Sequence, residues 1–172
     1  ISRQLSAGIL TVETAYNELL RVDGLPRRYP TGVRLLSGAM VSAGFSYLLG
    51  AHVRAFVSAG ITGLLVMLVM EFLQRKEVLY FVSLALAGVM ATVANLAVKW
   101  FWPSVQFDLA IIGSIMVLIP GLAITTSVRD ALFEDLVSAS IRGVEAFGVA
   151  LSIASGVGSV LTLYLWIGGT LP

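Results

Sequence analysis

The chain has 172 residues, of which 58% are apolar and only 12% charged, and its formal net charge is +1. Such an apolar composition excludes an ordinary soluble domain and indicates a membrane protein. The sequence has no cysteine and one histidine, His52, which excludes disulfides, thiolate metal sites and two-histidine metal sites within this chain.

The first predicted element is a short amphipathic helix over residues 11–22, with Thr11 as its N-cap. Apolar side chains recur there at three- and four-residue spacing, which is typical of a helix with one apolar face. A linker containing glycine and proline follows. We therefore expect residues 1–30 to be a cytoplasmic helix and linker, the remnant of a longer cytoplasmic domain, and residues 31–172 to be a transmembrane transporter domain.

Five uncharged stretches follow, and each is read as a membrane-spanning helix, which needs roughly 17 to 25 mostly apolar residues. The shortest of them, the second, is expected to use Glu71 and Phe72 at its inner end. The predicted fold class is an all-α membrane protein: a bundle of five transmembrane helices preceded by the short amphipathic helix. The stretches cover residues 35–51, 55–70, 78–98, 109–128 and 146–172.

Basic residues gather on one side of this predicted topology. Nine flank the side that holds the N-terminus, and only Arg54 and Lys99 fall on the other. The positive-inside tendency then places the N-terminus in the cytoplasm and the C-terminus outside a cell (inner) membrane. Because this charge is spread over loop flanks, nucleic acid is not a predicted partner. The nine are Arg3, Arg21, Arg27, Arg28, Arg34, Arg75, Lys76, Arg129 and Arg142.

Small residues recur every four positions in the first and fifth predicted spans, a spacing that lets helix backbones approach closely. We interpret these positions as packing surfaces between helices. They are Gly38, Ser42 and Ser46 in the first span and Ala150, Ala154 and Gly158 in the fifth.

The fourth span is interrupted by Pro120 and Gly121. Proline removes a backbone donor, and in hydrocarbon a freed backbone group must find a partner in protein or in a water-filled cavity. Transporters build polar solute sites at such breaks, where helix ends expose amide donors that attract a carboxylate. A polar run follows the break, and together with it forms the predicted substrate site. A proline kink beside a polar loop is the alternative. The run consists of Thr125, Thr126, Ser127, Arg129 and Asp130, with Asp130 as the partner of Arg129.

Three further residues have a possible coupling or structural role. Glu145 follows Arg142 by three positions, which favours an ion pair within one helix at the membrane boundary, whereas a carboxylate facing the cavity would titrate during transport. Asn95 in the third span would either bond a neighbouring helix or line the path. Glu71, Glu77 and Asp108 are interpreted as interfacial charges.

An enzyme is not predicted. The stretch of residues 44–47, Gly-Phe-Ser-Tyr, lacks the second glycine of a nucleophile elbow and lies in a helix, where the required strand-to-helix turn cannot form. We therefore predict no catalytic residue, no metal site and no cofactor.

The sequence LIPGLAITTSVRDALFEDLVSASIRGVEA, residues 118–146, resembles the hallmark segment of the threonine/serine exporter (ThrE) family. Pro120, Gly121, Asp130 and Arg142 match that segment, and Thr126 stands where such proteins often have asparagine. Residues 28–50 resemble the family's Arg-Tyr-Pro entry to the first span, while Arg54 lies where we would expect an aspartate.

The resemblance implies an exporter of small carboxylate-bearing metabolites, above all threonine and serine, in the lipid bilayer. It also implies a cytoplasmic domain ahead of this region and a second membrane unit of similar size, fused or separate, in a homo- or hetero-oligomer. If the second unit is fused behind this one, an odd number of spans would make it begin on the opposite side and form an inverted repeat, with a site between the halves. Two alternatives stay open: a dicarboxylate (succinate) exporter subunit, and a structural or assembly subunit of a heteromeric membrane complex.

Overall fold

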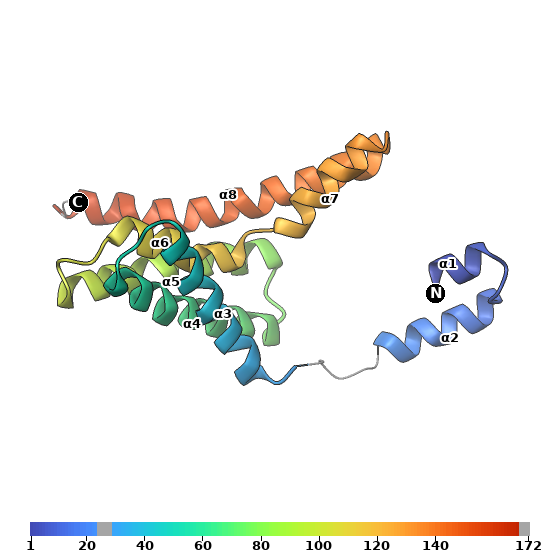
Figure 1. Cartoon of the computed structure of the whole chain (residues 1–172), viewed down its shortest axis with the longest axis horizontal. Helices are drawn as coiled ribbons and strands as arrows, with labels where there is room; N and C mark the ends of the chain where they lie inside the picture. The colour runs from blue at the N-terminus through green and yellow to red at the C-terminus, as the bar shows by residue number, and fades with distance from the viewer. Residues whose placement is uncertain (24–28, 169–172) are drawn as a thin grey trace. The chain divides into compact units, whose positions relative to one another are not determined.

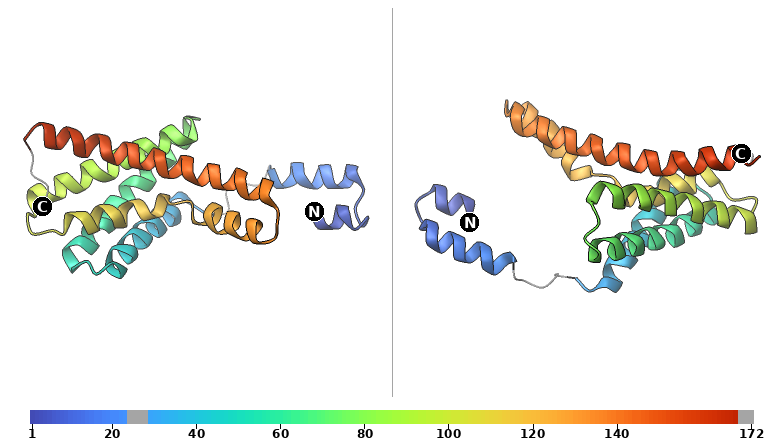
Figure 2. Two further views of the ribbon diagram at one scale, coloured as in Figure 1. Left: turned by 90° about the horizontal axis from the view of Figure 1, so that it is seen from above. Right: turned by 180° about the vertical axis from the view of Figure 1, so that it is seen from behind.

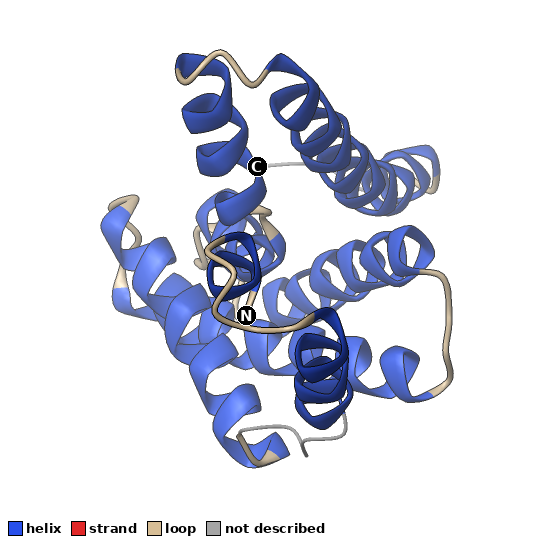
Figure 3. Ribbon diagram, turned by 90° about the vertical axis from the view of Figure 1, so that its right-hand side faces the viewer, coloured by secondary structure: helices blue, strands red, loops and turns tan. Residues whose placement is uncertain are grey.

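The computed structural model describes residues 1–23 and 29–168, and every regular element in these ranges is a helix (Figures 1 and 3). Residues 24–28 of the predicted linker and residues 169–172 of the predicted fifth span lie outside the described residues. The elements are α1 (Ser2–Ser6), α2 (Val12–Asp23), α3 (Thr31–Leu48), α4 (Val53–Arg75), α5 (Tyr80–Phe101), α6 (Phe107–Ile115), the 3-10 turn η1 (Met116–Leu118), α7 (Gly121–Leu132) and α8 (Leu136–Trp166).

The chain divides into two compact units, Ile1–Val33 and the residues from Arg34 onward. In the first unit, α2 begins where the sequence places an N-cap, because the Thr11 hydroxyl accepts the backbone N–H of Thr14 at 3.3 Å. Val12 and Tyr16 of this helix are exposed. The cytoplasmic location of residues 1–30 stays a prediction.

The second unit is a helical bundle with two apolar clusters. One cluster joins α4, α5 and α8 around Val66, Leu84 and Val149, each at most 1% exposed. The other joins the loop before α4, α4 itself and α6 around Ala55 and Phe107. Figure 2 shows α8 running beside α5, with α4 on the far side of α5. These contacts bury apolar side chains of α4, α5 and α8, the three longest helices, against one another.

Close backbone approaches hold the bundle together at small residues. A Cβ atom on Gly156 of α8 would lie 2.9 Å from the carbonyl carbon of Ala85 in α5, so only glycine fits there. Ser42 of α3 lies against Gly63 of α4, and both Ser42 and Ser46 are 0% exposed. The packing role predicted for the small residues of α3 is therefore what the structure shows.

The corresponding residues of α8 behave differently. Ala150 and Ala154 are exposed, and no atom lies within 4 Å of the place that a Cβ on Gly158 would take, so these three positions make no close backbone approach among the described residues. The α5–α8 contact instead uses Gly156, which lies on a different face of α8 and approaches the backbone of Ala85 and Val89.

Within residues 1–23 and 29–168, three helices, α4, α5 and α8, are long and apolar enough to cross a membrane, and a fourth span results if α6–η1 and α7 are counted as one bent span. By the criteria of length and composition, the described residues therefore contain three or four candidate spans, fewer than the five predicted. The helix that is not counted is α3, whose 18 residues include the charged Arg34 as well as the serines and glycines of its packing face. That α3 also spans the bilayer stays a prediction.

The boundaries of the last two predicted spans differ from the structure. The fourth, predicted over 109–128 with a break at Pro120, extends from Phe107 to Leu132 as two helical segments, α6–η1 and α7, that meet at an angle of 65°. The fifth helix begins at Leu136, ten residues before the predicted start at 146. With 31 residues, α8 is about 46 Å long at 1.5 Å per residue, which exceeds the roughly 30 Å of a hydrocarbon core. Its first turns therefore extend beyond the length that a span requires.

Candidate functional site

The break in the chain lies at Pro120, between η1 and α7. Pro120 has φ −80° and ψ 60°, which is outside the helical region, and the N–H of Gly121 donates to Ile119 O at 2.9 Å. The helical pattern resumes when the N–H of Ile124 donates to Pro120 O at 3.0 Å. The proline and glycine that the sequence singles out therefore end one helix and begin another.

After the break, α7 packs against the first half of α8 as a helical hairpin (Figure 1). Ser127 of α7 donates to the carbonyl oxygen of Ala139 in α8 at 2.7 Å. Beside this bond, a Cβ on Gly143 would lie 3.3 Å from the Ser127 hydroxyl, so the two helices are close. The hairpin thus brings the polar run of α7 next to residues of α8 more than ten positions away in sequence.

The two threonine hydroxyls of α7 are occupied within their own helix. Thr125 donates to Gly121 O at 2.9 Å, and Thr126 donates to Leu122 O at 2.6 Å. A threonine oxygen that donates in this way still has lone pairs for a further donor. Thr126 uses one of them, accepting from Arg142 at 3.4 Å.

Asp130 is the centre of the charged part of the hairpin. Its Oδ1 lies 3.0 Å from Nη2 of Arg129, and its Oδ2 lies 3.2 Å from Nε of Arg142. The Asp130 side chain is only 13% exposed, whereas the arginines are 64% and 48% exposed. Two guanidinium groups therefore share one carboxylate, and both keep surface that a second carboxylate can reach.

The expected pair between Arg142 and Glu145 is replaced by the pair with Asp130. The sequence predicts a helix start at 146, whereas α8 begins ten residues earlier, so Arg142 lies within α8 and reaches Asp130 of α7 while its side chain stays 48% exposed. Glu145 is exposed on the same helix. Near the hairpin turn, hydrogen bonds from Ser138 lower the pKa of the Asp135 carboxyl, because they stabilise its charged form.

Asn95 is buried at 0% exposure and bonds neighbouring helices. Its Nδ2 donates to Ser114 of α6 at 3.1 Å and to Ala91 O at 2.8 Å, while its Oδ1 accepts from Ser58 of α4 at 3.0 Å. This network joins α4, α5 and α6, and so fixes the helix that leads into the break.

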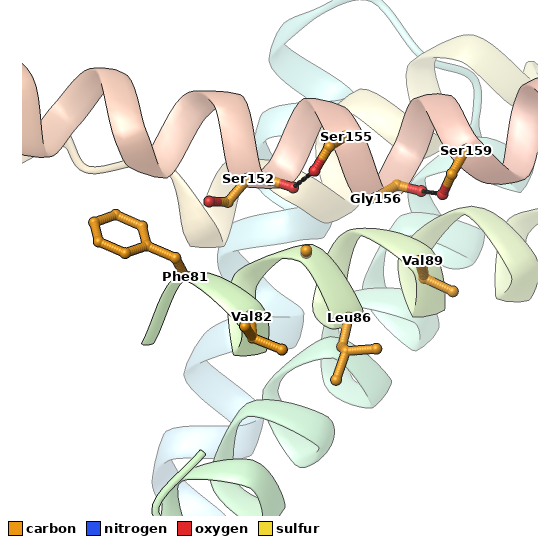
Figure 4. A pocket seen from close by; sticks show the side chains of 9 residues that line it. Phe81, Val82, Leu86, Val89, Ser152, Ser155, Gly156 and Ser159 are labelled. Atoms are coloured by element: carbon orange, nitrogen blue, oxygen red, sulfur yellow. Dashed lines mark hydrogen bonds between the residues drawn. The ribbon is translucent and has the colours of Figure 1, made fainter. Parts of the chain in front are cut away.

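Two grooves flank α8. The one beside the break, about 410 Å³, is apolar and lies between Ile115, Ile119 and the small residues of α8. The other, about 390 Å³, lies between α5 and α8 and is shown in Figure 4. Its α8 wall carries three serines, and Ser155 and Ser159 donate to carbonyl oxygens of their own helix. The groove beside the break is lined by residues of α6, α8 and the link before α7, and the hydroxyl residues of α7 do not line it.

Sequence reasoning missed a buried ion pair at the end of α4. Glu71, predicted to be interfacial, has a side chain only 9% exposed, and it pairs with Arg34 of α3 and at 3.4 Å with Arg75. The spacing of Glu71 and Arg75, four residues apart in a helix, can be read from the sequence. The pairing with Arg34 cannot, because it joins helices 37 positions apart. Among the described residues, no group of three or more potential metal ligands occurs.

The family model ThrE, described as "Putative threonine/serine exporter", matches residues 1–164. The chain belongs to the threonine/serine exporter family. A relative named threonine/serine exporter, from Corynebacterium glutamicum, is 30% identical over 163 residues, which cover 91% of this chain and 33% of the relative. The chain therefore spans about a third of that relative's length. No solved structure matches the chain significantly.

Membership in the ThrE family and the apolar helices identify a multi-pass membrane protein of an exporter family. The resemblance found in the sequence is thereby confirmed. In this chain the helical segment after the break at Pro120 forms a charged hairpin with α8.

Proposed function

We propose that this chain is a subunit or half of an exporter that moves threonine and serine across the inner membrane. The proposal is supported by the name of the relative from Corynebacterium glutamicum, which is threonine/serine exporter. Both solutes carry a carboxylate and a hydroxyl, and these are groups that arginine and threonine side chains bind.

The observation that carries the proposal is the shared carboxylate of Asp130. Arg129 and Arg142 outnumber the single carboxylate that they contact, and each is about half exposed or more. A solute carboxylate would bind the exposed edge of a guanidinium, as charge-assisted hydrogen bonds are roughly twice as strong as neutral ones. Asp130 is then the group that holds both arginines and offers an acceptor to the solute ammonium.

A second membrane unit completes the path in this proposal. The chain covers a third of the relative, and the α7–α8 hairpin leaves Leu122, Leu132 and Phe133 about 80% exposed. We propose that the N-terminus is cytoplasmic and the C-terminus outside, and that the second unit packs where these apolar side chains lie. This arrangement would enclose the arginines at an interface between two halves.

The test is efflux of labelled threonine from cells that lack the native exporter and express the full protein. We expect Arg129→Ala and Arg142→Ala to lower efflux at least tenfold with unchanged membrane expression. Arg54→Ala, which removes an arginine bonded to Ser104 at the opposite end of the bundle, is the matched control and keeps wild-type efflux. Wild-type efflux in both hairpin variants would refute the site. Loss of labelled succinate efflux instead of threonine efflux would move the substrate to dicarboxylates.

The structural alternative has one observation in its favour, because Ser127 and Asp130 bond α8 and so stabilise the hairpin. A purely structural role predicts that substitutions there reduce the amount of folded protein. Measuring efflux per folded molecule, by dividing flux by the amount recovered in size-exclusion chromatography, separates the two roles.

A further inference from the structure

A third groove lies on the outer surface of the bundle, between α4 and α5. Its volume is about 340 Å³, within the range of small-molecule clefts, and its lining is apolar. The α4 wall is formed by Phe72 and Leu73, and the α5 wall by Leu86, Met90 and Val93. In Figure 4 the side chain of Leu86 points away from α8, toward this side of α5. Because α4 and α5 both have the length and composition of membrane spans, the groove lies at a depth where hydrocarbon chains are present.

One end of the groove carries a positive charge. Lys76 follows the last residue of α4, and its Nζ lies 6.0 Å from the centroid of the Phe72 ring, which lines the groove. The carbonyl end of a helix favours a cation at this place. The groove is therefore apolar along its length and has an ammonium group beside its end.

The charged groups around this end leave Lys76 available. Glu71 is directed to α3, where Arg34 and Arg75 bind it, and its side chain is 9% exposed. Glu77 is the neighbouring acid, and it is exposed at a residue with φ 54°, in the turn between α4 and α5. The charged groups at this end are therefore Arg34, Arg75 and Lys76 against Glu71 and Glu77. Of the two acids, the buried Glu71 is already paired with both arginines.

We propose that the α4–α5 groove binds an anionic glycerophospholipid, with one acyl chain along the groove and its phosphate on Lys76. The chemistry matches in both parts, since an apolar surface takes the chain and a basic residue near the membrane surface attracts an anionic headgroup. A helix of a partner protein fits this place less well, because it would have to cover the Lys76 charge. The inference rests on the membrane location of the family and is independent of the exported solute.

The experiment is native mass spectrometry of the purified full protein in detergent, titrated with dioleoyl phosphatidylglycerol or dioleoyl phosphatidylcholine. We expect the wild type to retain the anionic lipid about fivefold better, the effect of one basic residue near a headgroup. Lys76→Gln should remove this preference and keep the weaker binding of phosphatidylcholine. The matched control is Lys99→Gln, because Lys99 also lies over a ring, 5.1 Å from the centroid of Phe107, but at the other end of α5. It should keep the wild-type ratio.

A second variant tests the chain-binding part. Met90→Trp fills the groove and should lower the retention of both lipids about equally, and Val93→Trp replaces it if Met90→Trp fails to give a monodisperse protein. Glycerol phosphate, which has the headgroup charge without a chain, should not displace the bound lipid. The proposal is overturned if the wild type retains the two lipids equally, if Lys76→Gln keeps the preference, or if neither tryptophan variant loses lipid. Displacement by glycerol phosphate alone would reduce the site to a phosphate site and overturn it as well.

Discussion

The contact between α5 and α8 is expected to fail when Gly156 becomes alanine. A Cβ at this position would lie 2.9 Å from the carbonyl carbon of Ala85 and 3.1 Å from the nitrogen of Val89, which are backbone atoms and cannot rotate away. The nearest backbone atom is the carbonyl oxygen of Ala85, which overlaps the new Cβ still more deeply, so an ordinary contact distance requires the helices to separate by about 1 Å, and such a gap forfeits up to about half of the dispersion energy of the atoms involved. Overpacking of this kind costs about 1–3 kcal/mol.

Gly158→Ala is the matched control, because it lies two residues along the same helix and no atom lies within 4 Å of the place that its new methyl group would take. Alanine there gains about 1 kcal/mol of helix propensity without a clash. Thermal unfolding followed by size-exclusion chromatography in detergent should therefore give a lower midpoint for Gly156→Ala and an equal or higher midpoint for Gly158→Ala. Equal midpoints for the two variants would refute the close approach of α5 and α8.

Three other predictions concern polar groups. Asn95→Ala removes two bonds between helices and should lower the unfolding free energy by about 1–2 kcal/mol in an SDS titration, and an unchanged value would contradict the network. Glu71→Gln should cost about 1–3 kcal/mol in the same assay, because Arg34 and Arg75 lose a charged partner, whereas Glu77→Gln at an exposed position should cost nothing measurable. The lowered pKa of Asp135 means that its cap stabilises α8 above pH 3.8 and is lost as the pH falls through the lower native value. The protection factor of the Ser138 amide, which compares its exchange rate with that of an unprotected amide at the same pH, should therefore fall only below pH 3.8 in the wild type and be low at every pH in Asp135→Ala.

Hydrophobicity is sufficient to find α4 and α5, and the proline–glycine step is sufficient to find the break. The uncharged stretches at 55–70 and 78–98 lie largely within α4 and α5, and Pro120 is where two helices meet. It is insufficient for α8, because the charged residues near its start resemble a loop between spans. Hydropathy indicates which residues can lie in lipid. The part of a helix that extends beyond the hydrocarbon core can be polar, so hydropathy does not mark where such a helix begins.

The sequence predicts which residues of α7 lie close together in the candidate site, but it does not predict their contacts with α8. Thr126, Asp130 and Arg129 lie within about one turn of each other on any helix, so their proximity follows from spacing. The bond from Arg142 to Asp130 depends on a short turn that folds α7 back on α8, and the hairpin angle is set by packing at Ala139 and Gly143. The burial of Glu71 depends in the same way on a partner helix.

The link at Ile119 and Pro120 also sets the rotational phase of α7 independently of α6. The Asn95 network fixes α6 on one side of the link, and the ion pair with Arg142 fixes α7 on the other. Because the link is not helical, a residue inserted there is not transmitted as a helical rotation, whereas a residue inserted within α7 between Ser127 and Asp130 would turn Asp130 by about 100° relative to Ser127, since a helix has 3.6 residues per turn. Asp130 would then point away from Arg142, so the register of α7 after the break is what keeps the two charges facing each other.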